Sequence, residues 1–315
     1  MSHSSRHLYE IGSSKNRIFT SFNQKDYLIV IGQLLSRMRL DLLAALVLCT
    51  LELWFTIPKG WLLSTRAVSV LGIAMSIFIG FRNTQAISRW WEARTLLEGI
   101  QNSSRIWADV LRVQLSDQHW ISSRVSRLVR LQVVIVWLLN FELRNFWHPD
   151  LRRMVDRLIT SLSLPSNSSV RSLSVQRAAE IQHLYRDNWI TEMGRRQLIE
   201  ACNYFADMVG GLERIRDTPI PPPYDIFVRL INWVFGSQLV LEFKRSGSPA
   251  TGILLFLGFL MAERIGAYVE GPFDLDGSSF SIPLNTICTS ISEDLMPNEL
   301  DYGRFKPRRN PVSWD

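Results

Sequence analysis

The sequence predicts an all-α membrane protein with a large helical part outside the membrane. Apolar residues make up 47% of the 315 residues, but they gather in a few blocks, and the remainder is rich in arginine and serine. Several blocks approach the roughly 18 to 20 residues that a helix needs to cross a bilayer. No stretch of any length shows the period-two alternation of apolar and polar residues that is typical of a β-strand.

A first pair of membrane helices is expected within residues 37–84. The block "LDLLAALVLCTLELWFTI" at 40–57 is long enough to span a bilayer, although Asp41 and Glu52 lie within it. The short "PKGW" at 58–61 then turns the chain into the second helix. Together they predict a helical hairpin.

The region 85–222 is expected to be a helical cytosolic region. "SLPSNSSVRSLS" at 163–174 predicts its main loop, and "MG" at Met193 and Gly194 a lesser interruption. "LQVVIVWLL" at 131–139 is too short to span and predicts a buried soluble helix. The adjacent glycines in "MVGGLER" at 208–214 indicate a close helix–helix contact or a bend.

A second pair of membrane helices is expected within residues 223–269. The proline cluster "TPIPPPY" at 218–224 cannot continue a helix and therefore marks its start. "KRSGSP" at 244–249 makes the turn, and "ATGILLFLGFLMA" at 250–262 is the most apolar block in the chain. The terminal segments, 1–36 and 270–315, are then expected to be cytosolic.

Three charged residues fall inside the expected spans. Buried charge is costly in a membrane, so Asp41, Glu52 and Arg229 predict spans packed in a bundle around polar space. The alternative is that Asp41 and Arg229 lie at the membrane interfaces.

An even number of spans puts both termini and the helical middle on one side. The arginines of that middle favour the cytoplasm, although both short turns are also basic.

Composition and motifs argue against an enzyme or a nucleic-acid-binding protein. The net charge is +6, but acidic residues alternate with the arginines, which indicates ion-paired helix faces and not a phosphate-binding stripe. Neither the five histidines nor the three distant cysteines, Cys49, Cys202 and Cys288, show metal-ligand spacing. No catalytic or phosphate-binding motif is present. We therefore expect no catalytic residues, no metal and no cofactor, and no cleavable signal peptide is seen at the amino end.

The stretch "IAMSIFIGFRNTQAISRWWEAR" at 73–94 changes from apolar to charged without proline, and without glycine after Gly80. It predicts one helix that leaves the membrane near Phe81 and continues into water. Ile73, Ile77 and Phe81 recur at i, i+4 and i+8 and so share one face. That face either packs on a neighbouring helix or, repeated around an axis by several subunits, narrows a pore and gates it by dewetting.

The second half of this stretch resembles the hallmark of the bestrophin family and its bacterial relatives, in which "FRN" follows the second membrane helix and "RWWEAR" trails it. Two weaker matches follow in order, "GLERIRDTPIPPPY" at 211–224 and "PF" followed by acids at 272–276. The resemblance covers roughly residues 20 to 300. The residues of the main motif are Arg82, Asn83, Arg89, Trp90, Trp91, Glu92 and Arg94.

The resemblance implies a homopentameric ion channel with one axial pore and four membrane helices per subunit, located in the cell membrane. Its hydrophobic neck would be lined by Ile73, Ile77 and Phe81, and a second, cytosolic constriction would lie near Met193. The permeating ions would be chloride and similar monovalent anions, and the other partners membrane lipids. Alternatives are a monovalent-cation channel of the same family or a non-conducting membrane scaffold with a basic helical region.

The resemblance also implies a departure in the segment after the last membrane helix. Animal members bind calcium there in a clasp of consecutive acids, whereas "PFDLDGSSFS" keeps a clasp carboxylate only at Asp276 and has Ser279 at the other clasp position. Asp274 and Asp276 are the residual clasp-like acids of this segment. Calcium prefers six to eight oxygen ligands with several carboxylates. We therefore expect a channel without calcium activation.

Overall fold

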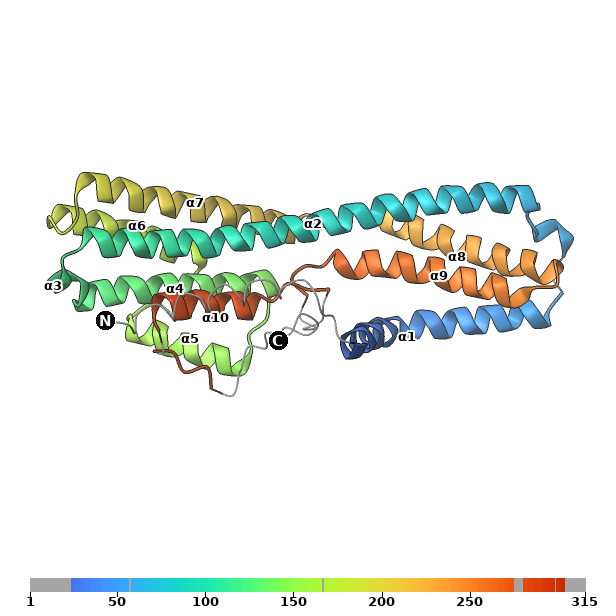
Figure 1. Cartoon of the computed structure of the whole chain (residues 1–315), viewed down its shortest axis with the longest axis horizontal. Coiled ribbons are helices and arrows are strands. Elements are labelled where there is room, and N and C mark those ends of the chain that lie inside the picture. Colours follow the sequence, from blue (N-terminus) through green and yellow to red (C-terminus); the bar gives the residue numbers. More distant parts are fainter. Residues whose placement is uncertain (1–23, 57, 166, 275–279, 298, 304–315) are drawn as a thin grey trace, which may run out of the picture.

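The computed structural model describes residues 24–56, 58–165, 167–274, 280–297 and 299–303, and every regular element in these ranges is helical (Figure 1). The all-α prediction is confirmed for this part of the chain. In chain order the elements are α1 (Gln24–Trp54), the 3₁₀ helix η2 (Lys59–Trp61), α2 (Thr65–Gln114), α3 (Asp117–Trp120), α4 (Ser123–Arg144), α5 (Pro149–Ser161), α6 (Val170–Arg186), α7 (Glu192–Asp217), α8 (Pro222–Arg245), α9 (Pro249–Val269) and α10 (Leu284–Leu295).

The molecule is elongated and has two helical parts that lie end to end (Figure 1). One part contains α1, the first half of α2, and the hairpin of α8 and α9. The other contains the second half of α2 with α3 to α7 and α10. Only α2 runs through both parts, so it fixes their relative position.

α2 is one unbroken helix of 50 residues. It begins where the Ser64 side chain accepts a hydrogen bond from the backbone N–H of Ala67 at 3.2 Å, which caps its first turn. It has no internal proline, and it packs against α8 and α9 in its first half and against α7 in its second. The predicted continuous helix is confirmed.

Three of the described helices, α2, α8 and α9, are long and apolar enough to cross a membrane. α1 is long enough but is not among them, because Arg37, Arg39 and Asp41 interrupt its apolar sequence. Its second half nevertheless presents exposed leucines and valine outward, including Leu43, which is 58% exposed. Both predicted hairpins are therefore present as helices.

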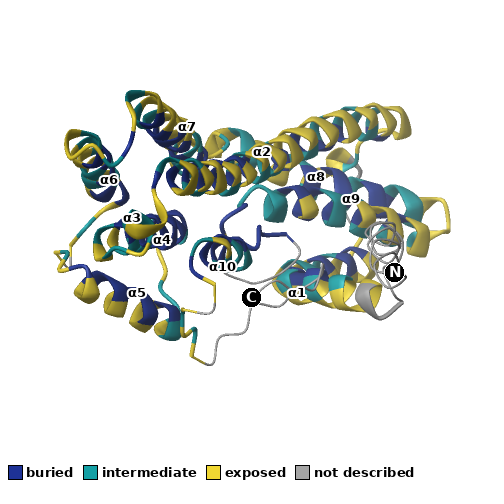
Figure 2. Cartoon of the chain, turned by 60° about the vertical axis from the view of Figure 1, so that its left-hand side comes forward, coloured by how far each residue is buried: buried dark blue, intermediate teal, exposed yellow. Residues whose placement is uncertain are grey.

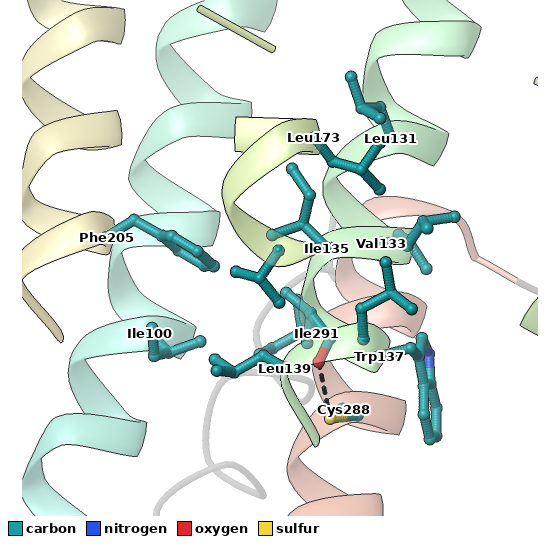
Figure 3. Close-up of a cluster of buried hydrophobic side chains, with 14 of the residues drawn as sticks. Ile100, Leu131, Val133, Ile135, Trp137, Leu139, Leu173, Phe205, Cys288 and Ile291 are labelled. Atoms are coloured by element: carbon teal, nitrogen blue, oxygen red, sulfur yellow. Dashed lines mark hydrogen bonds between the residues drawn. The ribbon is translucent and has the colours of Figure 1, made fainter. Parts of the chain in front are cut away.

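The large part away from these helices has its own core around α4 (Figures 2 and 3). Residues 131–139 are all buried, and Ile135 and Trp137 have no exposed surface. Side chains of α2, α6, α7 and α10 surround them, among them Ile100, Leu173, Phe205 and Ile291. The predicted buried soluble helix is confirmed.

The predicted interruption at Met193 and Gly194 is wrong. Both residues lie in the first turn of α7, where the Thr191 hydroxyl accepts a hydrogen bond from the Gly194 N–H at 3.0 Å. The chain instead breaks between Arg186 and Thr191. Gly194 packs closely against α2, and a Cβ there would lie 2.4 Å from the Gln114 side chain, which would have to move.

Close packing between helices also explains the paired glycines of α7. A Cβ on Gly211 would lie 2.9 Å from the Leu96 side chain of α2, whereas one on Gly210 would meet open space. Of the two predicted alternatives, the close helix–helix contact is therefore the correct one.

The same kind of contact in the α8–α9 hairpin gives a stability prediction. A Cβ on Gly236 would lie 1.9 Å from the fully buried Phe256 ring, so Gly236→Ala is expected to destabilise the protein by about 1–3 kcal/mol through overpacking. The matched control is Gly258→Ala on α9, where a Cβ meets open space and helix propensity favours alanine. Thermal unfolding in detergent measures both, and equal midpoints for the two variants would contradict this packing.

Candidate pore-lining site

Ile73, Ile77 and Phe81, here called the neck stripe, form an exposed face of α2. Their side chains are 65%, 52% and 63% exposed, whereas Met75, on the opposite side of the helix, is fully buried. Because α8 and α9 cover that opposite side, the neck stripe points away from the chain's own bundle. The stripe does not pack against another helix in the described part of the same chain.

The same exposed face continues along α2 past the neck stripe. Eighteen residues make five full turns, so Trp91 and Asp109 lie in line with Ile73. Further exposed residues on this face are Thr84, Thr95, Glu98 and Asn102. Exposed apolar residues recur on this face as well, since Ile106 and Val113 are 53% and 81% exposed, so below the neck stripe the face is mixed, and its charged members, Glu98 and Asp109, are acidic.

Arg82 follows directly after the neck stripe but points the opposite way. Its side chain is 1% exposed, and its guanidinium donates to the backbone carbonyl and carboxylate of Glu263, both at 3.0 Å. It also pairs with Asp225 and lies 3.7 Å from the Glu270 carboxylate. Three carboxylates from α8 and α9 therefore surround one guanidinium from α2.

A second group of ion pairs lies beside the first and extends it to α1. The Asp41 carboxylate accepts from Arg264 at 2.9 Å and from Arg229 at 3.2 Å, and Arg264 also lies 3.4 Å from Glu263. These contacts join the four helices of the apolar part at one level. We call this set the charged belt: Arg82, Asp225, Glu263 and Glu270 with Asp41, Arg229 and Arg264.

Asn83 strengthens the contact between α2 and α9 at the same level. Its side-chain amide donates to the Ala262 carbonyl at 3.0 Å. The close approach requires glycine at 266, because a Cβ there would lie 2.0 Å from the Asn83 side-chain oxygen. Arg82 and Asn83 of the sequence motif therefore have a common role, which is to hold α2 against α9.

Arg89 and Glu92 of the motif hold α2 against the end of α7. Arg89 donates to the Thr218 carbonyl at 2.6 Å and to that of Ile215, which caps the end of α7. Burial of this guanidinium lowers the pKa of Arg89, an effect that the nearby Glu270 and Glu92 carboxylates oppose. The other pairs are Glu92 with Arg214, and Arg94 with Glu98 at 3.2 Å.

The two motif tryptophans differ in their surroundings. Trp90 is half-buried and donates from its ring nitrogen to the Phe280 carbonyl at 2.9 Å, while Trp91 is 59% exposed. Their rings contact edge to face. Trp90 therefore belongs to the core boundary, and Trp91 to the exposed face of α2.

Glu52 lies at the other end of the apolar part and is buried. It accepts a hydrogen bond from the Ser237 hydroxyl, and the Lys244 ammonium donates to the Glu52 backbone carbonyl at 2.7 Å. Asp41 and Glu52 thus face other helices of the bundle, whereas the Arg229 side chain pairs with Asp41 and is 49% exposed. Spans packed around polar space, and the alternative of Asp41 and Arg229 at the membrane interfaces, both stay predictions.

Met193 lies far from the neck stripe. It is 63% exposed in the first turn of α7, next to the end of α2, where Thr191 donates to the Gln114 side chain at 2.9 Å. From Phe81 to Gln114, α2 rises about 50 Å. Beside Met193, hydrogen bonds from Arg195 and Arg196 lower the pKa of Glu192 to about 2, so this carboxylate is ionised at neutral pH.

The predicted clasp residues are only partly visible. Asp274 is exposed just after α9, whereas Asp276 and Ser279 lie outside the described residues. Among the described residues, no group of three or more histidine, cysteine or acidic side chains could hold a metal ion.

Sequence reasoning missed four of the belt residues: Asp225, Glu263, Arg264 and Glu270. One signal was present, since Glu263 and Arg264 are adjacent charges at the end of the most apolar block in the chain. In a membrane helix such a pair predicts internal ion pairs. Their partners on α1 and α2 are far away in sequence and could not be read from it.

The fold and the site together define a class of protein: an all-helical membrane-type protein. Its longest helix has an exposed apolar stripe in the apolar part and continues from there into the second helical part. The sequence profile described as bacterial/fungal bestrophin protein matches residues 14–297, so the chain belongs to the bestrophin family.

Curated relatives and solved structures agree with this assignment. The chain is 27% identical over 277 residues to the voltage-dependent anion channel-forming protein RSc3414 of Ralstonia nicotianae, covering 84% of this chain and 86% of that protein. It is 26% identical over 274 residues to the voltage-dependent anion channel-forming protein YneE of Escherichia coli, covering 85% and 87%. A variant of a bacterial bestrophin homolog from Klebsiella pneumoniae superposes with a TM-score of 0.69 at 25% identity, covering 84% of this chain and 98% of that one.

Proposed function

We propose that this chain forms a homopentameric channel in the cell membrane that conducts chloride and similar monovalent anions through a hydrophobic neck, without calcium activation. Each subunit contributes four membrane helices, two within residues 37–84 and two within 223–269. The helical region 85–222 and the terminal segments 1–36 and 270–315 are cytosolic. The protein catalyses no reaction, because selectivity and gating come from the pore walls.

The observation that carries this proposal is the orientation of the neck stripe. Three large apolar side chains point away from the subunit's own bundle, although the opposite face of the same helix is well packed. Rotational symmetry about an axis parallel to α2 turns such a face into stacked apolar rings. Rings of this kind form a constriction that excludes water until it widens.

The names of the relatives support anions as the permeating ions. Both the Ralstonia and the Escherichia proteins are described as voltage-dependent anion channel-forming proteins. Met193 supports a second constriction, since it is an exposed apolar side chain about 50 Å beyond the neck stripe on the helix that packs along α2.

A monovalent-cation channel of the same family is the second candidate, and two observations favour it. Arg82, the basic residue nearest to the neck stripe, is buried among three carboxylates and so contributes little field to a pore. Of the two acidic residues on the face of α2 below the neck stripe, Glu98 pairs with Arg94 at 3.2 Å, so Asp109 contributes the larger field. Acidic rings attract cations.

Reconstitution into planar bilayers under a KCl gradient tests conduction and separates the two candidates. An anion channel is expected to give a reversal potential close to the chloride equilibrium potential, and a cation channel one close to that of potassium. A reversal potential at zero would exclude a selective channel, and absence of current would leave the scaffold alternative. Chelation of calcium is expected to leave the current unchanged.

The pentamer is tested separately by mass measurement in detergent. The expected protein mass is five times the 36.4 kDa of one chain. Any other multiple would contradict the arrangement of five neck stripes around one axis.

A further inference from the structure

The first turns of α1, residues 27–35, form a helical arm that runs across the end of the apolar part. Figure 1 shows these turns, in dark blue, almost end-on, whereas the rest of α1 runs along the bundle. Three apolar residues, Leu28, Ile31 and Leu35, recur at i, i+3 and i+7 and so share one face of the arm. They are 70%, 49% and 43% exposed, and Tyr27 and Ile29 to either side of this face are also exposed, at 58% and 43%.

The arm lies at the level of the charged belt. Just beyond it, the Arg37 guanidinium lies 5.0 Å from the ring centroid of Tyr268 and 5.3 Å from that of Phe280, which holds the start of α1 against the end of α9. Four residues further on, Asp41 pairs with Arg229 and Arg264 of the belt. Charged side chains gather in this way where membrane helices leave the hydrocarbon layer.

The exposed face of the arm is continuous with the membrane-facing surface of α1. The line of Leu28, Ile31 and Leu35 passes through the exposed Arg39 and continues to Leu46, which is 64% exposed. An arginine in this position keeps its charge among headgroups while its aliphatic stem lies along apolar surface. The surface that meets lipid along α1 therefore bends with the helix into the plane of the membrane.

We propose that the arm is an interfacial helix that lies in the cytosolic headgroup layer and binds lipid through Leu28, Ile31 and Leu35. A helix of this kind buries its apolar face about 5–10 Å into the boundary between headgroups and acyl chains. The proposal rests on the membrane placement given under the proposed function but does not require conduction.

Site-directed spin labelling of the full-length protein tests the arm. Leu28→Cys carries the label, and the protein is reconstituted into vesicles of phosphatidylcholine and phosphatidylglycerol at about 3:1. Collision with oxygen and with a water-soluble nickel chelate then measures depth. The native cysteines Cys49, Cys202 and Cys288 are buried, and the unsubstituted protein gives the background labelling.

Two reference sites make the result decisive. Val47→Cys on the outer face of α1, 58% exposed, reports the hydrocarbon layer, and Val175→Cys on α6, 65% exposed, reports water. The Leu28 label is expected at a shallow depth in the bilayer, between the depth of the Val47 label and the aqueous position of the Val175 label. If it is as accessible to the nickel chelate as the Val175 label, or shielded from both reagents by a second copy of the chain, the arm proposal is wrong. If the Val47 label is also water-exposed, the membrane placement itself fails.

Discussion

Arg82→Gln is expected to destabilise the protein by about 3–5 kcal/mol, because it removes the guanidinium shared by Glu263, Asp225 and Glu270 and leaves the buried Glu263 carboxylate with Arg264 alone, at 3.4 Å. Glu263 is 1% exposed, so water cannot replace the lost partner. The measurement is thermal unfolding in detergent, where a loss of this size corresponds to a midpoint lower by about 10 °C. The unfolding midpoint of the Arg82→Lys variant should lie between those of the unsubstituted protein and Arg82→Gln, since an ammonium keeps the charge but not the forked geometry of the guanidinium.

The control for Arg82 is Arg94→Gln, which removes an exposed i,i+4 pair with Glu98 and should change stability by less than about 0.5 kcal/mol. A second control is the double variant Arg82→Gln with Glu263→Gln. If an unpaired buried charge causes the loss, the double variant should recover part of it. Equal midpoints for Arg82→Gln and Arg94→Gln would show that the charged belt does not hold the helices together.

Phe81→Ala is expected to raise single-channel conductance at least about twofold and to weaken closure, because in the proposed pentamer it widens the apolar ring formed by Phe81 and lowers its barrier to water. Phe81 is 63% exposed in the subunit, so its truncation should leave unfolding in detergent nearly unchanged. Ile77→Ala should act in the same direction. Single-channel recording in bilayers measures both.

The matched control for the neck is Ile87→Ala. Ile87 is 47% exposed on the same helix but follows the charged belt and is not in the neck stripe. Its truncation should change neither conductance nor closure. If Phe81→Ala and Ile77→Ala behave like Ile87→Ala, the neck lies elsewhere.

Much of the fold could be predicted from the sequence because helix periodicity is local. The stretch 73–94 has no proline and no glycine after Gly80, which predicted that α2 continues past Phe81. The apolar run at 131–139 predicted a buried helix. Met193 and Gly194 were misread for a related reason. A glycine inside a helix ordinarily destabilises it, but Gly194 packs closely against the Gln114 side chain of α2, and that contact is not local.

The charged belt could not be predicted, because its partners are brought together only by packing of distant segments. Arg82 contacts residues 143 and 181 positions away, and the Asp41–Arg229 pair spans 188. Spacing placed Ile73, Ile77 and Phe81 on one face but did not show whether that face was covered. The structure answers this within one subunit, since the covered face is the one that carries Met75 and Arg82.

Because α2 is one unbroken helix, a tilt about any point away from its middle moves its two ends by different distances. One attachment of α2 to the apolar part is the guanidinium of Arg82, which lies about 14 Å along the helix from Ile73 and about 48 Å from Gln114. For a rigid rod turning about that point, a tilt of about 3° moves the Gln114 end by roughly 2.5 Å and Ile73 by less than about 1 Å. In the proposed pentamer, a movement at the Gln114 end would therefore reach the neck stripe as a displacement roughly a quarter as large.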